Sequence, residues 1–413
     1  MIHCLVLLLV LLLCSPTDAM REGMQRISVG IVGGGLSGLA TAYHLAQSVR
    51  VQSLTIYDEA PGPGIGGASA VAAGLMHPFT PRARFIYRGL EGFAATTTLL
   101  RAAESHHPPS LPPLYSTAPI LRPCFTPEDL ETWTQGSQQH PTWLEMETPA
   151  AYQRRQRIGG QESDLDLDLG RPLGVAVMKG TVTIDTSAYL RALWLAVQQE
   201  ASGQPPGGGG SASQRQCQCE WRHERVSSLA ELSARHDVTV VAAGVGVPSL
   251  WSLPSLGRLG LKYVRGQNLV YPLRLRHAVL AGDYVVPSGD GGLVLAGATH
   301  EYGSVAELTA SRALPDAAAA EALVGDRLAA LLPALRSLRP LRATCGVRVV
   351  APRGSLGKLP LIARHDSLAN AYLLTGLGSR GVIHHAVMGQ YLAAAIVAGD
   401  PAGIPAELLA KAS

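Results

Sequence analysis

The chain is poor in cysteine, in aromatic residues and in charge. Of its 413 residues, 6 are cysteine, 5% are aromatic and 16% are charged. The cysteines beyond residue 20 are too few for a disulfide framework and too irregularly spaced for a zinc site; they are Cys124, Cys217, Cys219 and Cys345. The 34 basic and 31 acidic residues leave a formal net charge of +3 and no basic stripe, so we expect no nucleic-acid partner.

Long apolar runs are scarce as well. The run at residues 4–14 is too short to span a bilayer but is typical of a signal-peptide core, with cleavage near Ala19. No Lys or Arg precedes the run, so a start at Met20 or Met24 is the alternative. We therefore expect residues 1–19 to direct the protein to the secretory pathway, with a plastid or cytoplasmic location as the alternative. No other stretch is expected to span a membrane.

Glycine, by contrast, is plentiful, and one glycine pattern carries information about a ligand. In "GIVGGGLSGLATAYHLA", residues 30–46, Gly33, Gly35 and Gly38 satisfy G-x-G-x-x-G between an apolar run and small residues at helical spacing. The pattern predicts a strand, a tight turn and a helix. Such glycines let the backbone approach a pyrophosphate, and a helix starting near Leu36 would point its unpaired N–H groups at that group.

A carboxylate stands where a dinucleotide site needs one. "SLTIYDEA" predicts a second strand ending at Asp58, which lies 20 residues beyond Gly38. A carboxylate at this spacing can accept the hydroxyls of an adenosine ribose. The alternative is a glycine-rich turn in an unrelated α/β unit, and the combination of strands, glycines and Asp58 favours the dinucleotide site.

Two later segments indicate that this domain is assembled from distant parts of the chain. "HDVTVVAAG", residues 236–244, predicts another buried strand ending in small residues. "NAYLLTGLGSRGVIHHAVMGQYLAAAIVAG", residues 370–399, predicts a strand to Thr375, a glycine-rich loop and an apolar helix with Arg380 beside its start. A simple nicotinamide domain would have completed its sheet much earlier.

Seven separated motifs in this order resemble the D-amino-acid oxidase superfamily of FAD enzymes, which includes glycine and sarcosine oxidases. The resemblance runs from about Ile27 to Ala398. Besides the first glycine motif, it rests on "GGASAVAAGLMHP", "GTVTIDTSAYLRAL", "VTVVAAG", "VRGQNLVY", "YVVPSGDGGLVLAGATHE" and "CGVRV" followed by "KLPLI". The loop "GLGSRG" is also similar to the flavoprotein domain of the bacterial enzyme that completes 5-methylaminomethyl-2-thiouridine in tRNA.

The resemblance implies an α/β (α+β) fold with two parts. One is a discontinuous Rossmann-like FAD-binding domain, and the other is a substrate domain built on a mixed, largely antiparallel sheet. The FAD-binding domain would comprise residues 24–105, 170–258 and 341–413, and the substrate domain residues 106–169 and 259–340. Residues 203–216, rich in Gly, Pro and Ser, predict a flexible loop within the segment 170–258.

The resemblance also implies FAD as the cofactor and a set of residues around it. Those expected at the pyrophosphate and adenosine ribose are Gly33, Gly35, Leu36, Ser37, Gly38 and Asp58. Those expected along the phosphates, the ribityl chain and the flavin ring are Ala68, Ser69, Gly74 and Leu75. Val226 would present its backbone to the adenine, and Gly244 would leave room for the cofactor. Those expected at the pyrimidine edge of the ring are Gly378, Ser379, Arg380, Gly381 and Val382. Each small residue has tight packing as its alternative role.

Two arginines are the candidate catalytic residues. Enzymes of this family transfer a hydride from the carbon beside an amine to flavin N5, and oxygen usually reoxidises the flavin. Arg348, in "CGVRV", matches the family arginine whose guanidinium holds the substrate carboxylate. Arg380 and the helix start at Gly381 would stabilise negative charge on the reduced flavin. The alternatives are a surface arginine at a strand end for Arg348 and a loop cap for Arg380.

Several departures from the family pattern leave the substrate unassigned. Val349 follows the arginine where the family often has proline, and Ser288 stands where arginine is common. His77, His300 and Tyr302 could face a substrate or lie in packed or surface positions.

Neither covalent flavin attachment nor a metal site is expected. In the register set by Arg348, the position at which sarcosine oxidases attach FAD falls on Gly346 instead of Cys345, so we expect non-covalent FAD. The adjacent pairs His106–His107 and His384–His385 do not share a helix face, so no metal site is expected.

Three functions are compatible with these motifs. The favoured one is an FAD oxidase or dehydrogenase acting on a small amino acid or secondary amine, with O2 as the expected acceptor. The second is a flavoprotein that processes a carboxymethylaminomethyl group in tRNA. The third is a non-enzymatic FAD-binding module, for instance in trafficking, in which Arg348 has no role. The oligomeric state is not determined by the sequence.

Overall fold

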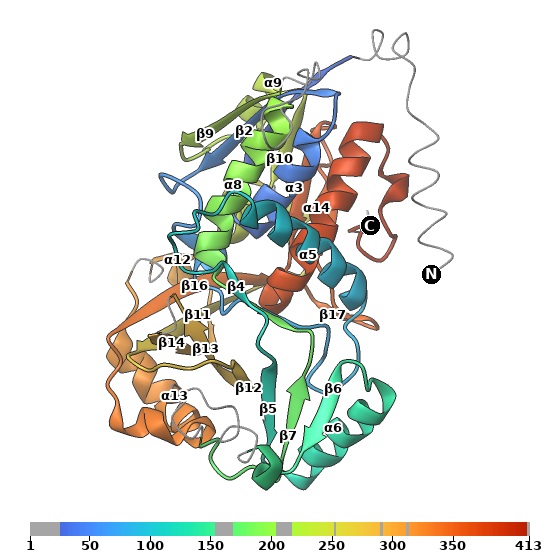
Figure 1. Ribbon diagram of the computed structural model, residues 1–413. Helices are drawn as coiled ribbons and strands as arrows, with labels where there is room; N and C mark the ends of the chain where they lie inside the picture. The colour runs from blue at the N-terminus through green and yellow to red at the C-terminus, as the bar shows by residue number, and fades with distance from the viewer. Residues whose placement is uncertain are drawn as a thin grey trace.

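The structure is a computed structural model that describes residues 25–152, 168–203, 217–251, 253–289, 292–310 and 314–410. The predicted signal peptide and most of the predicted flexible loop lie outside these residues. In the part of the chain that the structure describes, the strands form two large sheets and two small ones. The two large sheets occupy opposite halves of the molecule (Figure 1).

The first large sheet, called the parallel sheet below, has the strand order β19-β20-β10-β1-β2-β9. All neighbours in it pair in parallel except β19 and β20. Its strands are β1 (Ile27–Val32), β2 (Val51–Asp58), β9 (Gln218–His223), β10 (Val238–Val241), β19 (Leu361–Arg364) and β20 (Ala371–Thr375). They come from three distant parts of the chain, as the sequence predicts for a discontinuous Rossmann-like unit.

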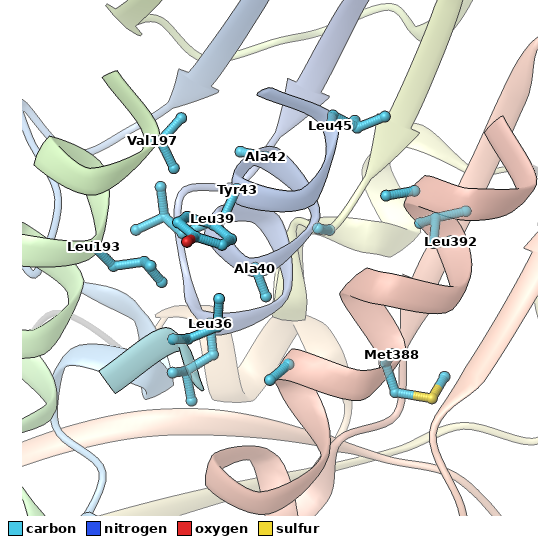
Figure 2. Packing of buried hydrophobic residues seen from close by; sticks show 14 of the residues in the cluster. Leu36, Leu39, Ala40, Ala42, Tyr43, Leu45, Leu193, Val197, Met388 and Leu392 are labelled. Atoms are coloured by element: carbon cyan, nitrogen blue, oxygen red, sulfur yellow. The ribbon is translucent and has the colours of Figure 1, made fainter. Parts of the chain in front are cut away.

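Helices on one side of the parallel sheet form the largest core. They are α3 (Leu36–Ala46), α5 (Gly89–Glu104), α8 (Thr186–Ser202) and α14 (Gly381–Ala398). Figure 2 shows Leu39 and Tyr43 of α3 on the side of α8, and Met388 and Leu392 of α14 on the other side of α3. α8 begins where the Asp185 side chain accepts a hydrogen bond from the Ala188 N–H.

α14 corrects one expectation from the sequence. Together with the turn before it, the segment Gly378–Ala398 is long and apolar enough to cross a membrane, although no such stretch was expected beyond the first residues. In the fold, 72% of its most apolar window is buried, and it packs against α3 and α5. Its apolar sequence therefore fills the protein interior.

The second large sheet, called the antiparallel sheet below, has the order β15-β11-β14-β13-β12-β5-β7-β6, with β16 also paired to β11. β12 and β5 pair in parallel, and the other pairs are antiparallel. Its strands are β5 (Ile120–Cys124), β6 (Leu144–Glu147), β7 (Gly174–Met178), β11 (Lys262–Tyr271), β12 (Val279–Ala281), β13 (Asp283–Ser288), β14 (Leu293–Gly297), β15 (Glu301–Tyr302) and β16 (Arg342–Val350). This sheet is the mixed, largely antiparallel one that the resemblance implies.

The antiparallel sheet takes strands from both predicted domains. β7 and β16 lie in segments predicted for the FAD-binding domain, yet they pair with β5 and β11. α13 (Ala317–Leu331) covers one face of this sheet and buries Val324 and Leu328 there. The predicted domain boundaries themselves stay a prediction.

The remaining described elements are further helices, 3-10 turns and two small sheets. The helices are α4 (Gly67–Ala70), α6 (Pro127–Gln139), α9 (Leu229–Arg235), α10 (Val247–Leu250), α11 (Leu253–Arg258) and α12 (Val305–Ala310). The 3-10 turns are η1 (Gly244–Gly246), η2 (Pro333–Ser337), η3 (Gly378–Arg380) and η4 (Pro401–Gly403). The small sheets are formed by β3 (Leu75–Met76), β4 (Tyr115–Ser116) and β8 (Val182–Ile184), and by β17 (Arg353–Gly354) and β18 (Gly357–Lys358).

Candidate functional site

The first glycine motif forms the turn between β1 and α3. Gly33 has a φ of 101°, and a Cβ there would lie 2.5 Å from the Ala242 carbonyl oxygen. A Cβ on Gly38 would overlap the Gly33 carbonyl oxygen. Neither position therefore accepts a side chain. The turn is tight, and no side chain of these two residues covers the N-terminus of α3. The backbone of Leu36 and Ser37 forms the first turn of that helix, and a pyrophosphate would lie at this N-terminus.

Ser69 lies across from this helix start. Its hydroxyl accepts a hydrogen bond from the Leu36 N–H at 3.1 Å, and a Cβ on Gly35 would lie 2.8 Å from the same oxygen. The structure thus brings together Gly35, Leu36 and Ser69. From the sequence, all three are expected beside the phosphates of the cofactor, although Ser69 belongs to a separate motif.

Asp58 ends β2 beside the glycine turn. Its carboxylate accepts hydrogen bonds from the Gly34 N–H at 2.6 Å and from the Ala60 N–H at 2.7 Å, one on each oxygen. A carboxylate has about four lone-pair directions, so both oxygens can accept further bonds from ribose hydroxyls. Val226 buries its side chain against Val32 and Tyr57, which leaves its backbone as the group it can offer to an adenine.

β16 connects the predicted cofactor segments that lie farther along the chain. A Cβ on Gly346 would lie 2.7 Å from the Ala68 Cα, so α4 lies directly on this strand. Farther along, Val350 pairs with Leu377, and a Cβ on Gly378 would lie 3.7 Å from a Val350 methyl carbon. η1, which begins at Gly244, also contacts β16. Segments around residues 68, 244 and 378 therefore meet along one strand.

The other predicted glycines differ in the space around them. Gly74 has a φ of 72°, and a Cβ there would overlap the Ile184 carbonyl oxygen, so this position before Leu75 needs glycine. Gly244 is exposed, and a Cβ there would meet no atom within 4 Å, so the space beside it is open. A Cβ on Gly381 would lie 3.6 Å from a Leu36 side-chain carbon, so the N-termini of α14 and α3 lie close together.

Arg348 lies on the β16 face that carries Gly346. Side chains alternate along a strand, so Arg348, Gly346 and Thr344 share one face, which is the face that α4 contacts. Among the described residues, the Arg348 Nη2 and the Thr344 hydroxyl are buried without a hydrogen-bond partner. A buried guanidinium nitrogen without a partner is costly, so the arrangement suits an anionic ligand.

Glycine beside Arg348 gives its guanidinium room. Gly266 of β11 stands opposite Gly346, and a Cβ on Gly266 would lie 3.2 Å from the Arg348 Nη2. A larger residue at this position would push the guanidinium out of its place above the sheet.

Tyr284 and Asn268 extend the same face across three strands. The Tyr284 hydroxyl donates to the Asn268 Oδ1 at 2.6 Å, and the Asn268 Nδ2 donates to the Val71 carbonyl at 2.9 Å. Gly297 pairs with both residues, and a Cβ on it would overlap the Asn268 amide oxygen. Burial raises the pKa of Tyr284 to about 12, while the positive charge of Arg348 acts in the opposite direction. Tyr284 is therefore a neutral phenol close to Arg348.

His300 lies near Arg348, whereas Tyr302 does not enter the interior. Burial lowers the pKa of His300, and the charge of Arg348 lowers it further. Tyr302 is 72% exposed, which agrees with its surface alternative. The sequence named His300 as one of several open cases and did not name Tyr284 or Asn268 as site residues. No pattern within one strand could have found these two, because their contact crosses β14.

Arg380 lies at the start of α14 with two neutral imidazoles nearby. It is half-buried, and its guanidinium makes no hydrogen bond or ion pair to another described residue; burial and the charge of Arg353 lower its pKa. Burial and the charge of Arg380 lower the pKa values of His77 and His384 to about 4. Ser379 is exposed, whereas Val382 is buried.

His384 and His385 have different surroundings. The His384 Nε2 is buried without a partner among the described residues. The His385 Nδ1–H donates to the Val382 carbonyl at 2.9 Å, and its Nε2 accepts from the Tyr189 hydroxyl at 2.9 Å. Both ring nitrogens of His385 are therefore hydrogen-bonded to groups of the protein itself.

Known proteins share the fold of this chain. A family model described as FAD dependent oxidoreductase matches residues 28–395. No curated protein sequence matches the chain significantly.

Solved structures share the fold at low sequence identity. Glycine oxidase from Geobacillus kaustophilus is 19% identical with a TM-score of 0.66, over 94% of this chain and 100% of that chain. Iminodiacetate oxidase from Chelativorans sp. BNC1 is 19% identical with a TM-score of 0.65, over 93% of this chain and 100% of that one. L-proline dehydrogenase from P. horikoshii is 13% identical with a TM-score of 0.64, over 91% and 95%.

Proposed function

Because the chain belongs to the family of FAD-dependent oxidoreductases, we propose that it oxidises the carbon–nitrogen bond of a small amino acid or carboxylate-bearing secondary amine. The observation that carries this proposal is the buried Arg348 Nη2, which has no partner among the described residues. A substrate carboxylate would pair with the guanidinium through two parallel hydrogen bonds and offset the cost of its burial.

The residues around the glycine turn fit FAD. Gly33 and Gly38 leave the backbone free of side chains, the N-terminus of α3 would hold the pyrophosphate, and Asp58 would hold the adenosine ribose. Arg380 and the N-terminus of α14 would hold the pyrimidine edge of the flavin. FAD, when bound, supplies the two-electron oxidation. We propose O2 as its acceptor.

Tyr284 orients the substrate amine in this proposal. The Tyr284 hydroxyl donates its hydrogen bond to the Asn268 Oδ1, so the lone pairs of its oxygen can accept a hydrogen bond from the amine. The phenol stays neutral because burial raises its pKa to about 12. Arg348 and Tyr284 would thus hold the two ends of a small amino acid in a fixed orientation.

We propose that the flavin is not covalently attached. Alternation along β16 places Cys345 on the face opposite Gly346 and Arg348, so its thiol does not face the predicted flavin position. Denatured protein should therefore release all of its yellow colour to the filtrate.

Anaerobic titration tests the substrate class. The purified yellow protein is mixed with amino acids and N-alkyl amino acids, and with matched amines that lack the carboxylate. A carboxylate-bearing amine should bleach the visible flavin bands, and admission of oxygen should restore them with release of peroxide. If no amine of either set reduces the flavin, the proposal is wrong and a non-enzymatic FAD-binding module becomes the better explanation.

Variants of Arg348 test the carboxylate contact. Arg348→Ala should lower kcat/KM for that substrate about 10- to 100-fold, mainly through KM, because charge-assisted hydrogen bonds contribute about 1.5–3 kcal/mol. Flavin content should not change. Arg342→Ala is the matched control, since Arg342 is exposed on the same strand. Equal kinetics for Arg348→Ala and Arg342→Ala would contradict the assignment.

A further inference from the structure

A group of polar side chains lies on the face of the antiparallel sheet opposite Arg348. Side chains alternate along β11, so Arg265 and Gln267 point away from the face that carries Gly266. Glu301 of β15 pairs directly with Arg265 and therefore lies on the same face as Arg265. Arg265 and Gln267 are buried. These three side chains do not reach the proposed substrate contacts directly.

The Glu301 carboxylate is the centre of this group. Its Oε1 accepts hydrogen bonds from the Thr299 hydroxyl at 2.5 Å and from the Gln267 Nε2 at 3.1 Å, and its Oε2 accepts from the Arg265 Nη1. Burial raises the pKa of Glu301, but these hydrogen bonds and the charge of Arg265 outweigh burial and hold the pKa below its ordinary value. The carboxylate is therefore ionised at neutral pH and fixes the Thr299 hydroxyl.

Thr299 is also held to β11 directly. Its hydroxyl accepts a hydrogen bond from the Gln267 N–H at 2.8 Å, and its own N–H donates to the Gln267 carbonyl at 3.1 Å. The Gln267 Oε1 in turn accepts from the Asp316 N–H at 2.8 Å, at the start of α13. Because both its hydroxyl and its N–H are bonded, Thr299 has little freedom to rotate, and its carbonyl is held in one position.

The Thr299 carbonyl lies on the Arg348 side of the sheet. A Cβ on Gly266 would lie 3.3 Å from this carbonyl oxygen and 3.2 Å from the Arg348 Nη2. The carbonyl and the guanidinium are therefore neighbours above the same glycine, although the Arg348 Nη2 forms no hydrogen bond to the oxygen. Thr299 is buried, so the partial negative charge of its oxygen attracts the guanidinium with little screening by water.

We propose that Glu301 is a positioning residue, which holds the Thr299 carbonyl beside Arg348 and thereby fixes the guanidinium for a substrate carboxylate. This inference rests on the proposed function, because it requires Arg348 to bind the substrate. Without the bond between Glu301 and Thr299, the carbonyl would shift and the guanidinium could rotate in the space that Gly266 leaves. A rotated guanidinium no longer presents two parallel hydrogen bonds to a carboxylate.

Two variants of Thr299 test this link without removing a charge. Thr299→Val keeps the shape of the side chain but removes the hydroxyl, whereas Thr299→Ser keeps the hydroxyl. Thr299→Val should raise KM for the carboxylate-bearing amine about 2- to 10-fold, with a smaller change in kcat, because a hydrogen bond that positions Arg348 is lost. Thr299→Ser should restore most of the parent KM. The measurement is steady-state kinetics on the flavin-loaded protein.

Thr181→Val is the matched control. The Thr181 hydroxyl is also buried, donates to the Met178 carbonyl at 2.8 Å and accepts from the Ile120 N–H at 3.1 Å. It lies in the turn between β7 and β8, outside the contacts of Arg348. Thr181→Val should therefore lower stability in denaturant unfolding, as Thr299→Val does, but keep the parent KM.

A double-mutant cycle with Arg348→Ala separates positioning from a general loss of stability. Once the guanidinium is removed, no group is left to position, so Thr299→Val should raise KM no further in the Arg348→Ala background. Glu301→Gln should raise KM at least as much as Thr299→Val. If the buried charge of Arg265 prevents Glu301→Gln from folding, the Thr299 pair decides the question.

Binding of acetate, a carboxylate without an amine, gives a readout that needs no turnover. Titration of the flavin absorbance spectrum should show a weaker Kd for acetate in Thr299→Val than in Thr181→Val. The proposal is overturned if the two variants match in KM and acetate Kd, if Thr299→Ser restores nothing, or if the losses from Thr299→Val and Arg348→Ala add. These outcomes leave the proposed function intact, since an amine would still reduce the flavin of the parent protein; if no amine reduces it, both proposals fail.

Discussion

Single residues decide which ligand atoms the site can hold. Arg348 has a buried guanidinium nitrogen without a hydrogen-bond partner among the described residues. The Tyr284 hydroxyl donates its hydrogen bond to Asn268, so its oxygen can only accept a further bond. The first is a donor and the second an acceptor, so together they are complementary to a carboxylate and an amine. Asn268 links Tyr284 to the Val71 carbonyl by hydrogen bonds. Val71 lies just after Ala68 and Ser69, which are predicted to line the cofactor.

Replacing Asn268 tests this link. Asn268→Leu should lower kcat/KM about tenfold or more, because a buried hydrogen bond is broken and the Tyr284 hydroxyl is free to rotate. Asn268→Asp retains an acceptor and should keep more activity than Asn268→Leu. In a double-mutant cycle with Tyr284→Phe the two losses should not add. Additive losses in steady-state kinetics would mean that Asn268 does not act through Tyr284.

At the scale of elements, the close packing of α14 on α3 positions both helix N-termini. A Cβ on Gly389 of α14 would lie 2.7 Å from the Ala40 carbonyl carbon of α3, so the two backbones are in contact. This approach brings Gly381 beside Leu36, where each helix would direct its N-terminus at one end of the same dinucleotide. The glycine within an otherwise apolar helix is thus explained by packing.

Substitution of two helix glycines separates packing from helix propensity. Gly389→Ala should lower the free energy of unfolding by about 1–3 kcal/mol, because the helices must move apart. Gly325→Ala is the matched control in α13. There the nearest atom to a Cβ is 3.4 Å away, on the flexible Glu321 side chain, so this change should stabilise by about 0.5–1 kcal/mol. Denaturant unfolding measures both, and equal effects would refute the packing explanation.

At the scale of the whole molecule, buried neutral histidines link folding to pH. Burial lowers the pKa values of His44, His77, His384 and His385 to about 4, from an ordinary value of 6.5. Below pH 6.5 the unfolded chain takes up protons that the folded chain takes up only near pH 4. These groups therefore stabilise the fold fully above pH 6.5, and this stabilisation is lost as the pH falls toward 4.

Unfolding at several pH values tests this linkage. The free energy of unfolding should fall between pH 6.5 and 4, by at most about 3 kcal/mol for each histidine. His385→Gln removes one such group, so its unfolding free energy should fall less steeply over the same window. A variant with the same slope as the parent protein would show that His385 does not contribute.

Local patterns in the sequence were sufficient for the backbone at the adenosine end. Gly33, Gly38 and Asp58 lie within one strand–turn–helix–strand unit, and their spacing alone determines that they meet. The resemblance to the D-amino-acid oxidase superfamily added Arg348 and Arg380, which no local spacing connects to that unit. Their roles stay predictions that the variants above can test.

The sequence by itself determined the strand–turn–helix–strand unit, because hydrophobic period and glycine spacing act over short distances, and the two kinds of sheet followed from the resemblance of its motifs to a known family. The tertiary structure alone decided that residues near 68, 244 and 378 meet along β16, and that Tyr284 reaches Asn268 across Gly297. Strand register sets such contacts, and a shift of one residue would turn Arg348 and Asn268 to the opposite face. Register depends on the packing of whole sheets, so it appears only when the chain is folded.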